Sequence, residues 1–148
     1  MLRRIWFLAV CLFITHCWTK HKVSPKILTD CFSSQKILHL EQIKNALGIS
    51  GILTNSSAWR SKDNSAQIDL VIERADRVVD LCEMKFSRGK YQMTSSYAQK
   101  LLERASVFVA GTKTKYAVCN VLVTTYGVLD GKNYSVVDNE IVLDDLFL

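Results

Sequence analysis

Two carboxylates and a lysine lie on neighbouring apolar segments of the chain. Asp69 lies within one apolar run, and Glu83 and Lys85 lie at the end of the next. Carboxylate oxygens are the ligands that Mg²⁺ prefers, and a bound Mg²⁺ activates a coordinated water. An ammonium beside that water or beside a phosphate stabilises the charge that develops during hydrolysis. The residue types therefore predict a site for phosphodiester hydrolysis, with Asp69 and Glu83 as ligands of Mg²⁺ or Mn²⁺ and Lys85 as a catalytic residue.

Asp69 and Glu83 can meet only if two strands pair in one particular register. The runs 67–73 and 78–86 are rich in Val, Ile and Leu and are separated by a short polar stretch, which predicts a β-hairpin. A three-residue loop would bring Asp69 opposite Glu83. A two-residue loop would pair Asp69 with Cys82 and turn Glu83 away. The hypothesis therefore requires the odd loop or a bulge.

Alternation along the strands predicts which side chains share a face. Glu83 and Lys85 share one face, and Met84 points to the other. Gln67 shares a face with Asp69 and is a candidate to orient a water. A Glu-x-Lys pair is common by chance, and as a surface pair it would contribute only about 0–1 kcal/mol. The prediction therefore depends on the combination with Asp69 and with the basic segment that follows.

Basic residues after the two runs are candidates for phosphate contacts. They are Arg88, Lys90, Lys100 and Arg104. For each of them singly, ordinary solvated charge is the simpler interpretation. The formal net charge of +5 favours a polyanionic partner but does not identify one. DNA is the expected partner for the predicted chemistry. Tyr97 and Trp59 are interpreted as core or rim aromatics rather than base-stacking platforms.

Length and composition indicate one folded domain in a reducing compartment. The chain has 148 residues, of which 49% are hydrophobic and 22% charged, so it can bury a core. Its five cysteines are odd in number and show no zinc-binding spacing. Cys82 and Cys119 lie in apolar runs and are expected to be buried reduced thiols, which favours the cytoplasm. No GxxxxGK[ST] phosphate loop is present.

The first 37 residues differ from the rest and are left unassigned. Arg3 and Arg4 precede an apolar stretch at 5–14. Three interpretations compete: an export signal, a membrane-associated segment, or an apolar segment without a targeting role that arises from a non-native start. The third is favoured because the remainder has cytoplasmic character. No stable membrane partner is expected.

Hydrophobic periodicity and turn residues predict an α/β order of elements. The predicted helices are 37–47, which ends at Gly48, and a second that is capped by Thr94 or Ser95 and runs to about Val109. The predicted strands outside the hairpin are 51–59, 116–126, 134–137 and 140–142, and a helical turn is expected at 144–147. This order indicates a mixed β-sheet flanked by helices.

With these residues, the chain resembles the PD-(D/E)xK nuclease superfamily, and more narrowly the nuclease-like carboxy-terminal domain of prokaryotic AAA-type ATPases. The resemblance covers about residues 38–148 and rests on the stretches 39–49, 67–72, 81–86, 124–127 and 144–147. It implies a restriction-endonuclease-like fold with a mixed sheet core flanked by helices. It also implies that Asp69 and Glu83 occupy the metal-binding acid positions and that Lys85 occupies the catalytic lysine position.

The sequence departs from the family pattern in two places. The first helix of the family usually carries a glutamate before the position matched by His39, whereas residues 32–36 contain no acid. Glu41, one turn along, is a candidate replacement. The ATPase module with its phosphate loop is absent, which suggests a fragment, a decayed gene or a solitary domain. The alternative function is therefore a catalytically inactive regulatory or interaction module that works with an AAA-type ATPase.

Overall fold

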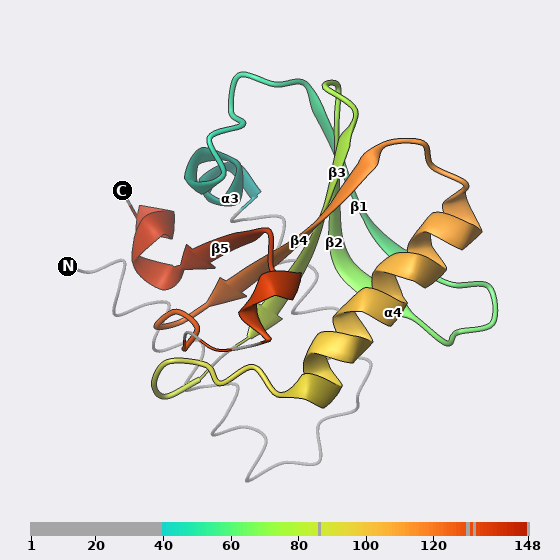
Figure 1. Cartoon of the computed structure of the whole chain (residues 1–148). Helices are drawn as coiled ribbons and strands as arrows, with labels where there is room; N and C mark the ends of the chain where they lie inside the picture. The colour runs from blue at the N-terminus through green and yellow to red at the C-terminus, as the bar shows by residue number, and fades with distance from the viewer. Residues whose placement is uncertain (1–39, 86, 130, 132, 148) are drawn as a thin grey trace, which may run out of the picture. The chain divides into compact units, whose positions relative to one another are not determined.

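A five-stranded mixed sheet forms the centre of the protein. The structure is a computed structural model that describes residues 40–85, 87–129, 131 and 133–147. The strands are β1 (Thr54–Arg60), β2 (Gln67–Arg74), β3 (Val78–Lys85), β4 (Ala117–Thr124) and β5 (Asn139–Val142). They lie in the order β1-β2-β3-β4-β5, antiparallel from β1 to β3 and parallel from β3 to β5 (Figure 1). The predicted α/β class with a mixed sheet flanked by helices is confirmed.

Two α-helices and two 3₁₀ helices accompany the sheet within the described ranges. They are α3 (Leu40–Ala46), α4 (Ser95–Thr112), η1 (Tyr134–Val136) and η2 (Leu143–Phe147). The predicted segment 1–37, its apolar stretch 5–14 and His39 lie outside the described residues. None of the helices in the described part of the chain combines the length and apolar character needed to cross a membrane.

The β2–β3 hairpin has the odd loop that the site hypothesis requires. Strand β2 ends at Arg74 and β3 begins at Val78, and the loop closes with a hydrogen bond from the Arg77 N–H to the Arg74 carbonyl (3.1 Å). Arg77 takes a left-handed φ of 65°, which is typical of the last residue of a three-residue hairpin loop. The paired residues run from Glu73–Val79 to Leu70–Cys82. The register that the site hypothesis requires is therefore observed as far as Leu70–Cys82.

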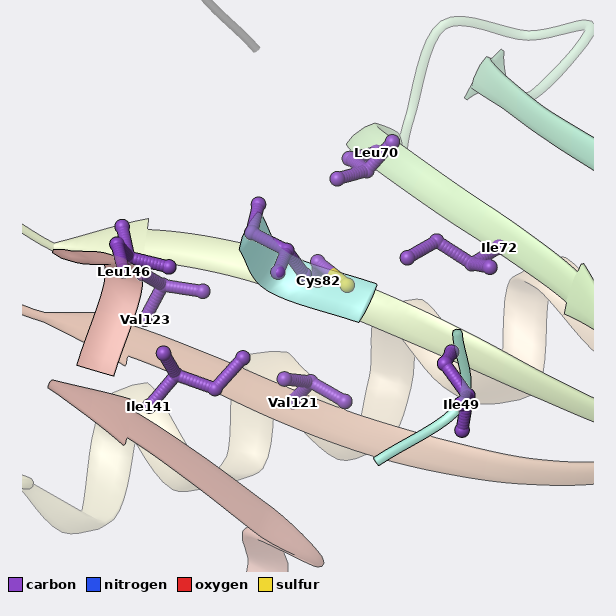
Figure 2. Packing of buried hydrophobic residues seen from close by; sticks show 9 residues of the cluster. Ile49, Leu70, Ile72, Cys82, Val121, Val123, Ile141 and Leu146 are labelled. Carbon is purple, nitrogen blue, oxygen red and sulfur yellow. The ribbon is translucent and has the colours of Figure 1, made fainter. Parts of the chain in front are cut away.

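One face of the sheet packs against α3 and η2. Leu70 and Ile72 of β2, Cys82 of β3, and Val121 and Val123 of β4 gather on this face (Figure 2). They meet further apolar side chains from the surrounding segments: Ile43, Ile49, Ile141 and Leu146. Each fully buried aliphatic side chain contributes about 1.5–3 kcal/mol to the free energy of folding. Met84 also packs here, as alternation along β3 predicts.

The other face of the sheet packs against α4. Phe108 of α4 is 2% exposed and meets Val71 and Leu81 of the sheet. Its ring makes an edge-to-face contact with Trp59, with 5.1 Å between the ring centroids, so Trp59 is the core or rim aromatic that its sequence position predicts. Since α3 and α4 cover opposite faces, Glu83 and Lys85 lie on the α4 side of β3.

Helix α4 begins as predicted and ends later. The Thr94 hydroxyl accepts a hydrogen bond from the Tyr97 N–H (3.3 Å) and caps the first turn. The helix continues past Val109 to Thr112, and Lys113 closes it in a left-handed conformation. Its Lys113 N–H donates to the Val109 carbonyl at 2.8 Å, which satisfies one carbonyl of the last turn.

Two strand predictions are wrong in detail. Residues 134–137 were predicted to form a strand, but Tyr134–Val136 is a 3₁₀ helix. The turn that begins at Gly131 continues here, because the Tyr134 N–H donates to the Gly131 carbonyl (3.0 Å) and the Val137 N–H to the Tyr134 carbonyl (3.0 Å). Strand β1 begins at Thr54 and not at Gly51, since a turn occupies the residues before it.

Both cysteines of the sheet are free thiols. Cys82 is buried, as predicted, and burial raises its pKa well above the ordinary value. Cys119 is only half-buried, and burial also raises its pKa. Neither thiol has the lowered pKa of a reactive cysteine, so both act as small hydrophobic groups.

Candidate functional site

Glu83 and Lys85 form a close ion pair on the α4 side of β3. The Lys85 Nζ lies 2.9 Å from Glu83 Oε1, and the two side chains are 29% and 13% exposed. Alternation along the strand places both on the same face, so the pair follows directly from the Glu-x-Lys spacing. The structure therefore brings together two of the three predicted catalytic residues.

Two residues of α4 complete the surroundings of Glu83. The Tyr97 hydroxyl donates to Glu83 Oε1 at 2.7 Å, and the Arg104 guanidinium donates to Glu83 Oε2. Tyr97 and Arg104 lie two helical turns apart, so both project from the side of α4 that faces the sheet. Leu101 lies between them and is buried, which fixes that side of the helix against the sheet.

Tyr97 and the ammonium of Lys85 are also in contact. The Lys85 Nζ lies 4.5 Å from the centroid of the Tyr97 ring, a distance suited to a cation–π interaction. The interpretation of Tyr97 as a core or rim aromatic did not include these contacts with Glu83 and Lys85. The only signal for it in the sequence is its place in the first turn of a helix that follows the Glu-x-Lys strand.

The pKa values of the three groups record this arrangement. Burial raises the pKa of Glu83. The hydrogen bonds from Tyr97 and Lys85 and the positive charges of Arg104 and Lys85 lower it by a larger amount, so this pKa lies below its ordinary value. Burial lowers the pKa of Lys85, and its contacts with Tyr97 and Glu83 raise it more. Burial is also the main cause that raises the pKa of Tyr97 to about 12. At neutral pH Glu83 is ionised, Lys85 is charged and Tyr97 is a hydrogen-bond donor.

Asp69 lies at the neighbouring end of β2. The pairs of the β2–β3 ladder end at Leu70–Cys82, one residue before Asp69 and Glu83, so the meeting of these two carboxylates stays a prediction. Gln67 Nε2 donates to Asp69 Oδ1 at 3.3 Å, so Gln67 contacts the predicted metal ligand. Arg60 of β1 holds the Gln67 amide in turn, with 2.7 Å between Nη2 and Oε1.

A bulge in β2 adjoins Asp69 and was not predicted. Strand β1 pairs Ser57 with Val71 but Trp59 with Ile68, so β2 carries one extra residue in this interval. The bulge changes the alternation of β2, because Ile68 packs with Val71 on the α4 side. Bulges redirect side chains and are common beside active sites. Asp69 therefore lies where β2 departs from regular geometry.

Glu41 is not placed to replace the missing acid of the family pattern. It lies on α3, which covers the opposite face of the sheet from Glu83. Its side chain is 72% exposed and pairs with Lys44, with 3.0 Å between the charged atoms. Residues 32–36 lie outside the described part of the chain.

The predicted phosphate-contacting residues differ in their surroundings. Arg88, Lys90 and Lys100 are exposed, and their contacts with phosphate stay predictions. Arg104 is only 22% exposed because it pairs with Glu83. It is therefore an ion-pair partner of Glu83, a contact that the sequence pattern did not indicate.

Asp69 and Glu83 lie on adjacent strands, and their carboxylate oxygens are the type of ligand that Mg²⁺ prefers. Asp69 and Glu83 would hold the ion, and backbone carbonyls and waters commonly complete such a shell. Among the described residues, no three His, Cys, Asp or Glu side chains gather into a metal-binding group. Glu83 Oε1 already accepts from Tyr97 and Lys85, so Oε2, which accepts from Arg104, is the oxygen with the greater remaining capacity.

A small cavity lies between the sheet and α4 beside these residues. Its volume is about 10 Å³, and Glu83, Arg104, Asn120 and Leu101 are among the residues that line it. This volume is about that of one water site, so no nucleotide could enter it.

Comparisons with known proteins do not assign a chemistry to this site. No family model matches the chain, and no curated protein matches it. A solved structure described as the protein of unknown function AF1548 is similar, with a TM-score of 0.46 and 18% sequence identity. The similarity covers 70% of this chain and 56% of that chain, so this chain matches little more than half the length of that protein.

Proposed function

We propose that residues 38–148 form a metal-dependent nuclease-like domain that hydrolyses phosphodiester bonds in DNA. The observation that carries this proposal is the Glu83–Lys85 pair, 2.9 Å apart on β3, next to strand β2, which carries Asp69. The resemblance to the PD-(D/E)xK superfamily gives these three residues the corresponding roles.

In this proposal Asp69 and Glu83 hold Mg²⁺ or Mn²⁺, which would neutralise charge on the phosphate and activate a water. Lys85 places a charged ammonium beside the reacting phosphate or the attacking water. Gln67, in contact with Asp69, orients a water at the edge of the site. Arg88, Lys90 and Lys100 are exposed cations that would bind the DNA backbone.

The proposed setting is the cytoplasm, together with an AAA-type ATPase module. The free thiols of Cys82 and Cys119 suit a reducing compartment. The ATPase partner follows from the resemblance alone.

One observation favours the alternative of an inactive regulatory or interaction module. Both oxygens of Glu83 already accept hydrogen bonds from Tyr97, Lys85 and Arg104, so this carboxylate is neutralised without a metal ion. A catalytically inactive module would keep these hydrogen bonds and ion pairs for stability and would not need to bind Mg²⁺ at Asp69.

DNA cleavage separates the two functions. Supercoiled plasmid and single-stranded DNA are incubated with the full chain in Mg²⁺, in Mn²⁺ or in excess chelator. The native protein is compared with Glu83→Ala and Lys85→Ala, and with Lys115→Ala as a control at an exposed position outside the site. Circular dichroism and thermal unfolding verify that each variant folds.

We expect metal-dependent cutting by the native protein and by Lys115→Ala, and a loss of at least about a hundredfold in both site variants. Cutting that survives in chelator or in both site variants would show that another protein or another site is responsible. A folded native protein that cuts neither substrate would favour the regulatory module.

A further inference from the structure

We infer that Arg104 and a divalent metal ion compete for Glu83, so that Arg104 sets how tightly the site binds the metal. This inference rests on the proposed function, because it assumes that Glu83 is a metal ligand. It concerns a residue for which the sequence suggested only a phosphate contact.

The contacts of Glu83 identify the oxygen at which the competition occurs. Oε1 accepts from the Tyr97 hydroxyl at 2.7 Å and from Lys85 Nζ at 2.9 Å, so two donors converge on one atom. Oε2 accepts from Arg104. A carboxylate oxygen offers two lone-pair positions, so a metal ion would bind most readily at Oε2 and would meet the guanidinium there.

The two cations of the site differ in how they are held. Lys85 is on the same strand as Glu83 and also lies against the Tyr97 ring, 4.5 Å from its centroid. Arg104 reaches across from α4 on a long side chain that is 22% exposed. Among the described contacts, Arg104 is held at the site by its ion pair with Glu83, whereas Lys85 is held by two contacts, so Arg104 is the cation that we expect a metal ion to displace.

Charge balance gives the competition its direction. Lys85 and Arg104 bring two positive charges to the single carboxylate of Glu83. A divalent cation at Oε2 would repel the guanidinium at short range, and the two would not share that oxygen at low energy. Arg104 thus stabilises the metal-free carboxylate and opposes the metal. Once displaced, it remains at the edge of the site as a cation that can bind phosphate.

Metal binding measured without any DNA tests the inference. Mn²⁺ is titrated into the full chain and followed by the electron paramagnetic resonance signal of the free ion. The proteins are native, Arg104→Gln, Glu83→Gln and Lys115→Gln, the last removing an equal charge from an exposed position outside the site. We expect Arg104→Gln to bind Mn²⁺ about tenfold more tightly than native and Lys115→Gln to change affinity by less than about twofold.

A second measurement uses the native protein and does not depend on a folded Arg104 variant. The ¹⁵N–¹H resonance of the Arg104 side chain is followed during a Mg²⁺ titration. We expect a saturable change in chemical shift and a gain in mobility, because the guanidinium leaves Glu83. An Arg104 resonance that is unchanged at saturating Mg²⁺ would overturn the inference.

The outcomes separate this inference from the proposed function. If Glu83→Gln loses Mn²⁺ binding while Arg104→Gln binds no more tightly than native, the competition is overturned and the metal site stands. If Arg104→Gln also loses binding, Arg104 assists the metal and the inference is overturned. If native protein and Arg104→Gln both fail to bind Mn²⁺ and native protein fails to cut DNA, the inference and the proposed function fall together.

Discussion

Strand β3 carries two acidic residues whose surroundings differ in kind. Glu83 faces α4, is 13% exposed and accepts hydrogen bonds from Tyr97 and Arg104. Asp80 pairs with Ile72 on the opposite face and is fully buried. Within the described structure neither oxygen of Asp80 has a hydrogen-bond partner. A carboxylate on an apolar strand is thus tolerated in two ways, and only one of them assembles a potential site.

The two acids also differ in the sign of their pKa shifts. Burial raises the pKa of Asp80, and the nearby Arg74 offsets this only in part, since Nη1 lies 3.6 Å from Oδ2, too far for a hydrogen bond. The donors around Glu83 overcome the effect of burial and lower its pKa. The hydrogen bonds and positive charges of Tyr97, Lys85 and Arg104, and not exposure alone, keep Glu83 ionised.

The largest expected difference between the two acids is in activity. Glu83→Gln keeps the shape of the side chain but removes the charge that would hold the metal, so we expect DNA cleavage to fall by at least about a hundredfold. Asp80→Asn should retain cleavage within about threefold, because Asp80 lies on the other face. Initial rates of plasmid nicking measure both. Equal losses of nicking rate in the two variants would contradict the assignment of the site to the face that carries Glu83.

The two acids should also affect stability with opposite signs at pH 7. Glu83→Gln leaves Arg104 and Lys85 without a charged partner, so the free energy of unfolding should fall by about 1–3 kcal/mol. Asp80→Asn removes a buried charge, so the free energy of unfolding should rise by on the order of 1 kcal/mol. Urea denaturation of the two variants and the native protein tests this. A less stable Asp80→Asn would mean that the pair with Arg74 outweighs the burial of Asp80.

Acidification should reduce both stability differences. The lowered pKa of Glu83 gives stability that is fully present above its ordinary value of 4.5 and is lost as the pH falls through the lower folded-state pKa. The raised pKa of Asp80 favours folding below its ordinary value of 3.8, and this is lost as the pH rises through the folded-state pKa. Urea titrations at pH 3 and pH 7 should therefore show smaller effects of both substitutions at pH 3. A stability difference for Glu83→Gln that grows toward pH 3 would contradict the assignment.

The smallest expected effect comes from the phenol that donates to Glu83. Tyr97→Phe removes one hydrogen bond to a charged acceptor and keeps the ring against Lys85, so stability should fall by about 1.5 kcal/mol or less. The pKa of Glu83 should rise toward its ordinary value. Carbon-13 NMR titration of the Glu83 carboxyl measures the shift, and a pKa that does not move would show that Tyr97 has no part in holding it down.

The hairpin could be predicted from the sequence because it depends on local rules. Whether the loop between Arg74 and Val78 has an odd or an even number of residues sets the strand register. Side-chain alternation along β3 then places Glu83 and Lys85 on the same face. The cap at Thr94 is local in the same sense. Such features depend on a few consecutive residues, so they can be predicted from the sequence alone.

The partners of Glu83 could not be predicted because they come from a distant element. Tyr97 and Arg104 reach Glu83 only because α4 packs on that face of the sheet, and the helical pattern alone does not specify which strand lies beneath. The 3₁₀ turn at Tyr134–Val136 was missed for a similar reason, since the Tyr134 hydroxyl and the Asn133 amide make side-chain contacts with Glu140 and Met93. Tertiary contacts overrode the strand propensity of the segment.

The most direct test of the central claim is metal-dependent DNA cleavage by Asp69→Asn beside the native protein. Asp63→Asn is the matched control, since it removes an exposed acid from the loop before β2. We expect native protein and Asp63→Asn to cut DNA, and we expect the cleavage rate of Asp69→Asn to be at least about a hundredfold lower. Cutting by Asp69→Asn at the native rate, or no metal-dependent cutting by a folded native protein, would contradict a nuclease site at Asp69, Glu83 and Lys85.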